Sequence, residues 1–185
     1  MEPRLATQDL VLCACGAKVA RAIGTNRAHA SLLCGCALHR DWPDAELPGV
    51  LESYAKLIEA YPDKIGWGVW LFVREGVVIG DGGFHGPPKE GRVQIGYSIV
   101  PEHRRRGYAT QAVAALCGWG IERGAKSIVG FCDPDNEPSA RVLDNCGFRE
   151  MPMLPTGDGS RPQRKWVFWP GGPLSFFPRK RRTGK

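Results

Sequence analysis

The stretch PEHRRRGYAT, residues 101–110, joins a segment with the apolar alternation of a strand to a segment with the apolar spacing of a helix. A helix start usually carries Ser, Thr, Asp or Asn, whose side chain accepts a hydrogen bond from the first backbone N–H groups. This start carries Arg104, Arg105, Arg106 and Gly107 instead. Uncapped N–H groups, three positive charges and an adjacent glycine predict a site for a polyanion such as pyrophosphate. A solvated basic turn is the alternative.

The segments on both sides of this stretch indicate an α+β order. Alternating or continuous apolar residues predict strands at 5–12, 67–73, 77–79, 92–100, 127–132 and 165–169. Helical spacing predicts helices at 51–61, 108–123 and 136–145, with one or two short helices between 13 and 38. Gly and Pro predict a loop at 82–91. The sequence therefore predicts a mixed sheet with flanking helices and one central crossover.

Positive charge is concentrated at two places in the chain, which has 185 residues and a formal net charge of +6. Five of its 25 Lys and Arg residues lie in the last seven positions, which leaves 20 against 19 acidic residues upstream. We expect one domain over residues 1–169 and a basic, Pro- and Gly-rich tail over 170–185. The near-neutral body argues against a large nucleic-acid surface, while the tail offers contacts to a ribosome or another acidic partner.

The composition also bears on location and metal binding. No apolar run approaches the roughly 20 residues that cross a bilayer, so we expect a cytoplasmic protein without membrane contact, as a monomer or a homodimer. Seven cysteines, an odd number, are expected to be reduced thiols. Cys13-x-Cys15 and Cys34-x-Cys36 have a C-x-C spacing, unlike the C-x-x-C of most zinc sites, so we expect no metal site.

The basic stretch resembles motif A of the GNAT N-acetyltransferases, R/Q-x-x-G-x-G/A, with Arg104, Gly107 and Ala109 in the three fixed places. The segment IGYSIVPEHR before it is similar to the strand that leads into this motif in the ribosomal-protein N-terminal acetyltransferase branch. The segment NEPSARVLDNCGF after it resembles that branch's N-x-x-S-x-x-x-L-x-x-x-GF element, and LATQDLVL resembles its first strand. The resemblance covers about residues 5–169, with its elements in the family's order.

This resemblance implies the GNAT fold, with about six to seven strands splayed at a site for acetyl-CoA. It implies that the backbone amides of Arg105 to Ala109 bind the pyrophosphate, and that Ile99 and Val100 hydrogen-bond the pantetheine arm as an added strand. The cofactor-binding residues carried over are Ile99, Val100, Arg104, Arg105, Arg106, Gly107, Tyr108, Ala109, Thr110 and Asn136. The alternatives are that Tyr108 only packs and that Asn136 only caps a helix.

The reaction that the resemblance implies is direct attack of a primary amine on the thioester of acetyl-CoA. Ser139 matches the family serine that reaches the sulfur and acts as general acid, the alternative being an exposed first-turn hydroxyl. Gln94 stands where many relatives have a glutamate, and an amide cannot act as a base. His85, in the expected loop GFHGPP, is the alternative base, because imidazole titrates near 6.5.

The missing glutamate bears on the acceptor. A lysine amine is only about 0.1% neutral at pH 7.4, whereas an α-amino group is roughly a quarter neutral, so the change mildly favours amines of low pKa. Protein N-termini, small-molecule amines and antibiotics remain open. The sequence predicts an acetyl-CoA-dependent N-acetyltransferase. The alternatives are a non-catalytic acetyl-CoA sensor and a ribosome- or nucleic-acid-associated protein that uses the basic tail.

Overall fold

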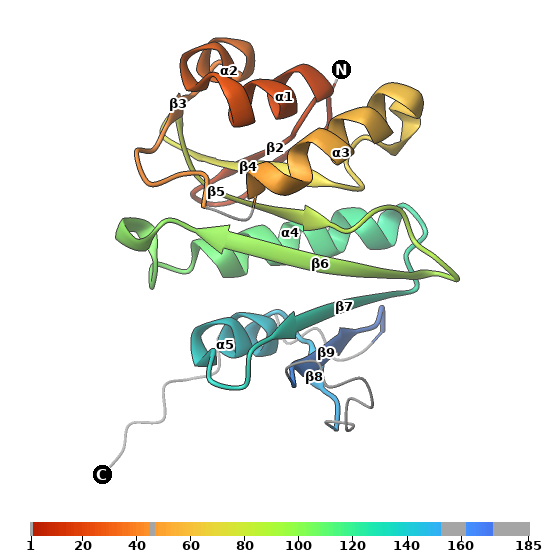
Figure 1. The fold of residues 1–185 in the computed structure, drawn as a ribbon. Coiled ribbons are helices and arrows are strands. Elements are labelled where there is room, and N and C mark those ends of the chain that lie inside the picture. The colour runs from red at the N-terminus through yellow and green to blue at the C-terminus, as the bar shows by residue number, and fades with distance from the viewer. Residues whose placement is uncertain (1, 45–46, 153–161, 172–185) are drawn as a thin grey trace.

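A computed structural model of the chain describes residues 2–44, 47–152 and 162–171 (Figure 1). The strands are β1 (Arg4–Ala6), β2 (Val11–Ala14), β3 (Ala37–Leu38), β4 (Val69–Arg74), β5 (Val77–Phe84), β6 (Arg92–Ile99), β7 (Ser127–Cys132), β8 (Arg149–Glu150) and β9 (Arg164–Phe168). The helices are α1 (Ala17–Thr25), α2 (Arg27–Cys34), α3 (Leu47–Ala60), α4 (Tyr108–Glu122) and α5 (Glu137–Asn145), with short 3-10 turns η1 (Pro62–Lys64) and η2 (Pro101–His103). Of the tail expected at 170–185, all but the first two residues lie outside the described chain.

The strands form one mixed sheet in the order β1-β2-β4-β5-β6-β7-β9-β8, with β3 paired to β5. Two pairs are parallel, β3 with β5 and β6 with β7. The mixed α+β architecture is therefore confirmed. The sheet has nine strands within the described residues rather than six or seven, because β3 and β8 are two-residue strands that give almost no sequence signal.

Two predicted strands have different bounds in the structure. The strand expected at 5–12 is a hairpin of β1 and β2, because Thr7 donates its backbone N–H to the Leu10 carbonyl, 2.8 Å away, and reverses the chain. Strand β5 continues to Phe84 through Gly80, Gly82 and Gly83, where a loop was expected. A Cβ atom at Gly80 would lie 2.3 Å from the Ser98 carbonyl oxygen, so this strand needs glycine to approach β6. His85 consequently lies at a strand end and not in a free loop.

Pairing between β6 and β7 stops halfway along the two strands. Their register runs from Arg92 opposite Ser127 to Ile95 opposite Gly130. Beyond this point β6 continues with β5, and β7 continues with β9. Figure 1 shows the two strands diverging toward their carboxyl ends. This divergence is the splay that the resemblance implied.

The two faces of the sheet carry different helices. In Figure 1, α3 crosses in front of the sheet and α4 lies behind β6. Trp119 of α4 packs against Trp70 of β4 and Phe84 of β5, with ring centroids 5.3 and 5.8 Å apart. On the same face, the Tyr97 hydroxyl of β6 donates to the Ser139 carbonyl of α5 over 3.1 Å. Helices α4 and α5 therefore cover one face together.

The opposite face holds a buried carboxyl group. Asp81 of β5 is the only charged residue classed as buried in the described parts of the chain, at 8% exposure. The Trp42 indole N–H donates to its Oδ1 over 2.7 Å, which ties the segment after β3 to the middle of the sheet. Burial raises the pKa of Asp81 to about 7, although the Trp42 hydrogen bond opposes the shift.

Replacing Asp81 with asparagine tests this arrangement. Because its folded pKa is raised above an unfolded value near 3.9, Asp81 opposes folding increasingly as pH rises from about 4 and most fully above 7. Asp81→Asn keeps an acceptor for Trp42 and carries no charge. We expect it to be about 1–3 kcal/mol more stable than wild type in urea unfolding at pH 8, with a smaller gain at pH 5. Asp63→Asn, at an exposed position, is the matched control, and a gain independent of pH would contradict the assignment.

Candidate functional site

The start of α4 has the uncapped geometry that the sequence predicts. Gly107, the residue before the helix, has φ +81° and provides no side-chain cap. Arg105 also has a left-handed backbone, with φ +62°. No described residue accepts a hydrogen bond from the backbone N–H groups of residues 105–110. A Cβ atom at Gly107 would meet nothing within 4 Å, so the space next to these N–H groups is open. The arrangement fits a polyanion.

The three arginines next to this helix start are exposed, but they are not equivalent. Arg104 donates its Nε–H to the Ile99 carbonyl over 2.8 Å, which holds the turn against the end of β6. The side chains of Arg105 and Arg106 form no hydrogen bond or ion pair with the described residues and are available to an anion. Tyr108 is 7% exposed, and the Arg74 guanidinium carbon lies 5.5 Å from the centroid of its ring. This packing agrees with the alternative that Tyr108 has only a structural role.

The backbone that borders the splay belongs to Tyr97 and Ile99. Val100 donates its N–H to the Ile79 carbonyl over 2.9 Å, and its carbonyl accepts from the His103 N–H over 3.0 Å. Both polar groups of Val100 thus have partners within the chain, and its hydrogen bond to an added strand stays a prediction that only the second lone pair of its carbonyl can satisfy. Along a strand, polar groups of successive residues point to opposite sides, which directs those of Tyr97 and Ile99 to the splay. The sequence reading missed Tyr97.

Asn136 and Ser139 lie on the far side of the splay, at the start of α5. The Asn136 Oδ1 accepts from the Ser139 N–H over 3.1 Å, so its predicted capping role is confirmed. The Ser139 carbonyl accepts from the Tyr97 hydroxyl, which bridges the divergent strands. The Ser139 side chain also interacts with Tyr97, because burial raises the pKa of Tyr97 and a side-chain hydrogen bond with Ser139 opposes that shift. Ala109 and Thr110 occupy the first turn of α4 and are half-buried.

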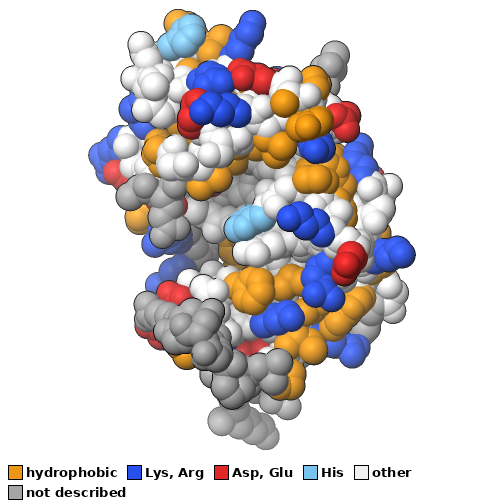
Figure 2. All heavy atoms as spheres, turned by 45° about the vertical axis from the view of Figure 1, so that its right-hand side comes forward, with side chains coloured by type: hydrophobic (Ala, Val, Ile, Leu, Met, Phe, Trp, Pro, Cys, Tyr) orange, Lys and Arg blue, Asp and Glu red, His pale blue; other side chains and the backbone are white. Residues whose placement is uncertain are grey.

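A pocket of about 410 Å³ lies on the other face of the sheet, beside the point where β6 and β7 part. His85 and Gln94, the two residues weighed for the base, both line it. The remaining lining residues are Pro87, Lys89, Glu90, Arg92, Val93, Val129, Phe131 and Lys165. Figure 2 shows a hollow in one face of the molecule, with a histidine and Lys or Arg side chains at its rim. Sequence reading missed Phe131 and Lys165, which reach this pocket from β7 and β9.

His85 lies where the splay begins. Its backbone N–H donates to the Gln94 carbonyl over 3.0 Å, and a Cβ atom at Gly96 would lie 3.3 Å from its Nε2. Gly96 is the first residue of β6 beyond the β7 pairing. His85 is exposed, yet partial burial of its ring lowers the pKa of the imidazole below 6.5. The imidazole is therefore neutral at pH 7.

The cysteines are free thiols throughout the described residues. Burial raises the pKa of the Cys15 and Cys117 thiols and raises the pKa of Cys146 to about 12. Burial, and after it the nearby Cys34, raises the pKa of Cys13 and of Cys36, so these three thiols lie near one another. Within the described chain, the one group of three metal-ligating side chains close enough to share an ion is His39, Glu102 and His103. No helix in these parts of the chain is long and apolar enough to cross a membrane.

Known proteins share this architecture. The sequence model described as the acetyltransferase (GNAT) domain matches residues 34–149. The N-acetyltransferase YjdG of Bacillus subtilis is 28% identical over 118 residues, which are 62% of this chain and 70% of that protein. Matched portions range from 34% to 70% of the curated relatives' own lengths.

Solved structures agree on the fold. The ribosomal-protein-S5-alanine acetyltransferase from Vibrio fischeri superimposes with a TM-score of 0.66 at 17% identity, covering 91% of this chain and 97% of that one. The ribosomal L7/L12 α-N-protein acetyltransferase RimL, solved with coenzyme A, gives 0.64 at 16% identity, covering 90% and 98%. Because the family model spans more than half of the sequence, the chain belongs to the GNAT family of N-acetyltransferases.

Proposed function

We propose that this protein transfers the acetyl group of acetyl-CoA to a primary amine of low pKa, either a protein N-terminus or a small molecule. One observation carries the proposal. The unpaired N–H groups at the start of α4 border the opening between β6 and β7. The hydroxyl of Ser139 lies beside that opening on one face of the sheet, next to Tyr97, and a neutral histidine lies beside it on the other.

The residues present fit acetyl-CoA. The N–H groups of Arg105 to Ala109 can hold its pyrophosphate, with support from the positive end of α4 and the free arginines. The N–H groups of Tyr97 and Ile99 can hold its extended arm as an added strand. Asn136 orders the first turn of α5 next to that arm. When bound, acetyl-CoA supplies a thioester whose carbonyl carbon is open to an amine.

The chain's own groups then move the two protons of the reaction. Residues next to each other on a strand point to opposite faces, so His85 lies on the face opposite Phe84 and α4. Ser139 lies on the α4 and α5 face, joined to Tyr97. His85 can accept a proton from an amine in the pocket, and Ser139 can donate one to the departing sulfur. Base and acid thus approach the splay from opposite sides.

The charges of the pocket bear on the acceptor. Lys89, Arg92 and Lys165 line it against a single carboxylate, that of Glu90. A positive field repels polycationic amines such as aminoglycosides and favours an amine that carries a carboxylate or a polar amide nearby. It also depresses the pKa of a bound amine, because the ammonium form is repelled. These effects support a peptide N-terminus or a small amino acid-like amine.

The helix start is tested with Gly107→Val. Because the site beside Gly107 is open, a branched side chain would occupy the space of the pyrophosphate. We expect acetyl-CoA affinity in calorimetry to fall at least tenfold, or about 1.4 kcal/mol. Gly124→Val is the matched control, since Gly124 also has a positive φ and open surroundings but lies past the other end of α4. Equal losses in both variants, or none in either, would remove the assignment.

The acid is tested with Ser139→Ala, which keeps the backbone contacts to Asn136 and Tyr97. We expect the single-turnover rate of acetyl transfer to fall roughly tenfold with acetyl-CoA affinity unchanged. Ser53→Ala, on the exposed face of α3, controls for removal of a hydroxyl. An unchanged transfer rate would leave Ser139 as a helix-start residue only. Tight binding of acetyl-CoA by wild type without turnover on any amine would favour the sensor alternative.

The base is tested by the pH dependence of kcat with an acceptor amine that stays neutral throughout the range. Because neutral imidazole accepts the proton, kcat should fall as pH drops through a pKa below 6.5. His85→Gln should abolish this fall in kcat at low pH and lower the maximal kcat at least tenfold. Separately, Gln94→Glu should raise the rate on amines of high pKa, because it supplies a carboxylate base. A limb near pH 7 that survives in His85→Gln and vanishes in Asp81→Asn would assign the base to Asp81 instead.

A further inference from the structure

Strands β3 and β6 meet end to end along one edge of β5. Strand β3 is parallel to β5 and pairs with Val77 and Val78, whereas β6 is antiparallel to β5 and pairs from Phe84 back to Gly80. The last bonds of the two strands go to neighbouring residues, because His39 N–H donates to Val78 and Val100 N–H donates to Ile79. The chain segments that leave β3 and β6 therefore start side by side.

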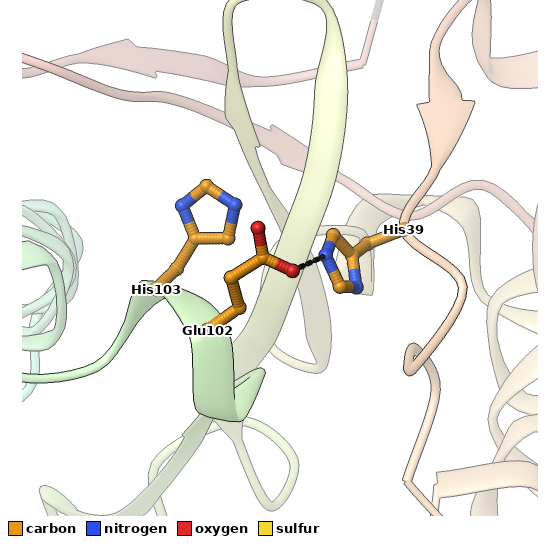
Figure 3. A group of neighbouring side chains, drawn as sticks. All are labelled: His39, Glu102 and His103. Carbon is orange, nitrogen blue, oxygen red and sulfur yellow. Dashed lines mark hydrogen bonds and ion pairs between the residues drawn. The ribbon is translucent and has the colours of Figure 1, made fainter.

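Those two segments bring three ligating side chains together (Figure 3). His39 follows β3, and Glu102 and His103 belong to η2. The His39 Nε2 and the Glu102 Oε2 are 3.3 Å apart, and the two imidazole rings meet edge to face with centroids 5.5 Å apart. One ligand atom from each residue lies within 4.8 Å of the other two. Sequence reading could not find this group, since 63 positions separate His39 from Glu102.

The spacing of these atoms suits a small divalent transition metal. Zinc binds histidine nitrogen and carboxylate oxygen at about 2.0–2.2 Å in a tetrahedral arrangement, which puts neighbouring ligand atoms roughly 3.3 Å apart. The His39–Glu102 pair already has that separation. The longest separation, up to 4.8 Å, must close by roughly 1.5 Å. A rotation of the exposed Glu102 side chain and of the half-buried His103 ring can supply it.

The surroundings of the two histidines also point to a ligand. The His103 Nδ1 is buried and has no hydrogen-bond partner among the described residues, which is an uncommon and costly state for a polar atom. At His39, the Nδ1 accepts the Asp41 N–H over 3.2 Å, and the Asp41 carboxylate lies 3.9 Å away. A metal on Nε2 would move the ring proton to Nδ1, which would then release the Asp41 N–H and donate to the Asp41 carboxylate, the usual outer contact of a metal-bound histidine.

Positive side chains oppose the ion at this place. Arg40 lies 3.6 Å from the Glu102 carboxylate. Arg106 and Arg74 lie near His103, whose pKa is lowered by burial first and then by His39 and these two arginines. Arg40 is 81% exposed and can turn away into water. The arginines therefore reduce affinity without blocking the ligand atoms.

We propose that His39, Glu102 and His103 bind a divalent transition-metal ion of the zinc type, with water in the fourth position. The ion would join the segment after β3 to η2, immediately before Arg104 and the uncapped start of α4. Such a link would hold η2, and with it the turn at Arg104 to Gly107, against the segment after β3. The proposal does not depend on the acetyl-transfer function.

Cobalt titration tests the site. Co²⁺ added to metal-free protein should bind at one equivalent and give weak visible absorption bands typical of nitrogen and oxygen ligands. It should give no strong near-ultraviolet band, which thiolate ligation would produce. Zn²⁺ should displace Co²⁺ and raise Tm, since it binds the folded state, and Mg²⁺ should do neither. No saturable binding, or thiolate bands, would overturn the proposal.

Variants locate the ion. Glu102→Gln and His39→Gln should each weaken Co²⁺ binding at least tenfold, and both positions allow a folded protein because Glu102 is exposed and His39 follows the two-residue strand β3. His29→Gln is the matched control, an exposed histidine on α2. Equal affinity in Glu102→Gln and wild type would place the metal elsewhere and refute this site.

Discussion

The loss of pairing between β6 and β7 after Ile95 and Gly130 is the constraint on which the rest of the site depends. It leaves the inner edge of Gly96 to Ile99 without a strand partner in the described chain. Arg104 satisfies the Ile99 carbonyl. The remaining polar groups of this edge need an added extended chain or water, because unpaired backbone groups away from water are costly. The helix start of α4, the Ser139 hydroxyl and the pocket around His85 all border this opening. Its position therefore sets which residues can meet cofactor and acceptor.

Strand β5 carries the second constraint, because three different elements use it. Its glycines admit β6 at close range, its first residues hold β3, and Asp81 anchors Trp42. The anchor retains a carboxyl group in an apolar setting, where an amide of the same shape would cost less at neutral pH. Asp81 lies opposite Ser98 in the register of β5 and β6, so it is on the face of the sheet that carries His85. Asp81 is thus a buried acid on the same face as His85, and a purely structural anchor for Trp42 does not require its charge.

Local signals and spatial contacts differ in how far the sequence reveals them. The uncapped turn at Arg104 to Gly107, the Asn136 cap and helices α4 and α5 follow from neighbouring residues, and the structure has them close to the expected positions. The extension of β5 was missed because Gly82 and Gly83 indicated the start of a loop, although in the structure they allow close strand contacts. The use of Val100 within the sheet, the bridge from Tyr97 to Ser139 and the approach of His39 to Glu102 depend on pairing between distant segments. No pattern of neighbouring residues in the sequence predicts these three contacts.

The reactivity of the buried thiols in the α4 and α5 layer reports local opening of that part of the fold. Cys117 and Cys146 are 3% and 9% exposed, and burial keeps both protonated at neutral pH. Alkylating reagents attack the thiolate, so these positions can react only when the layer opens to water. The partly exposed Cys13, Cys34 and Cys36, near the other end of the sheet, need no such opening. The relative labelling rates of the two groups would thus separate local opening beside the cofactor site from simple surface chemistry.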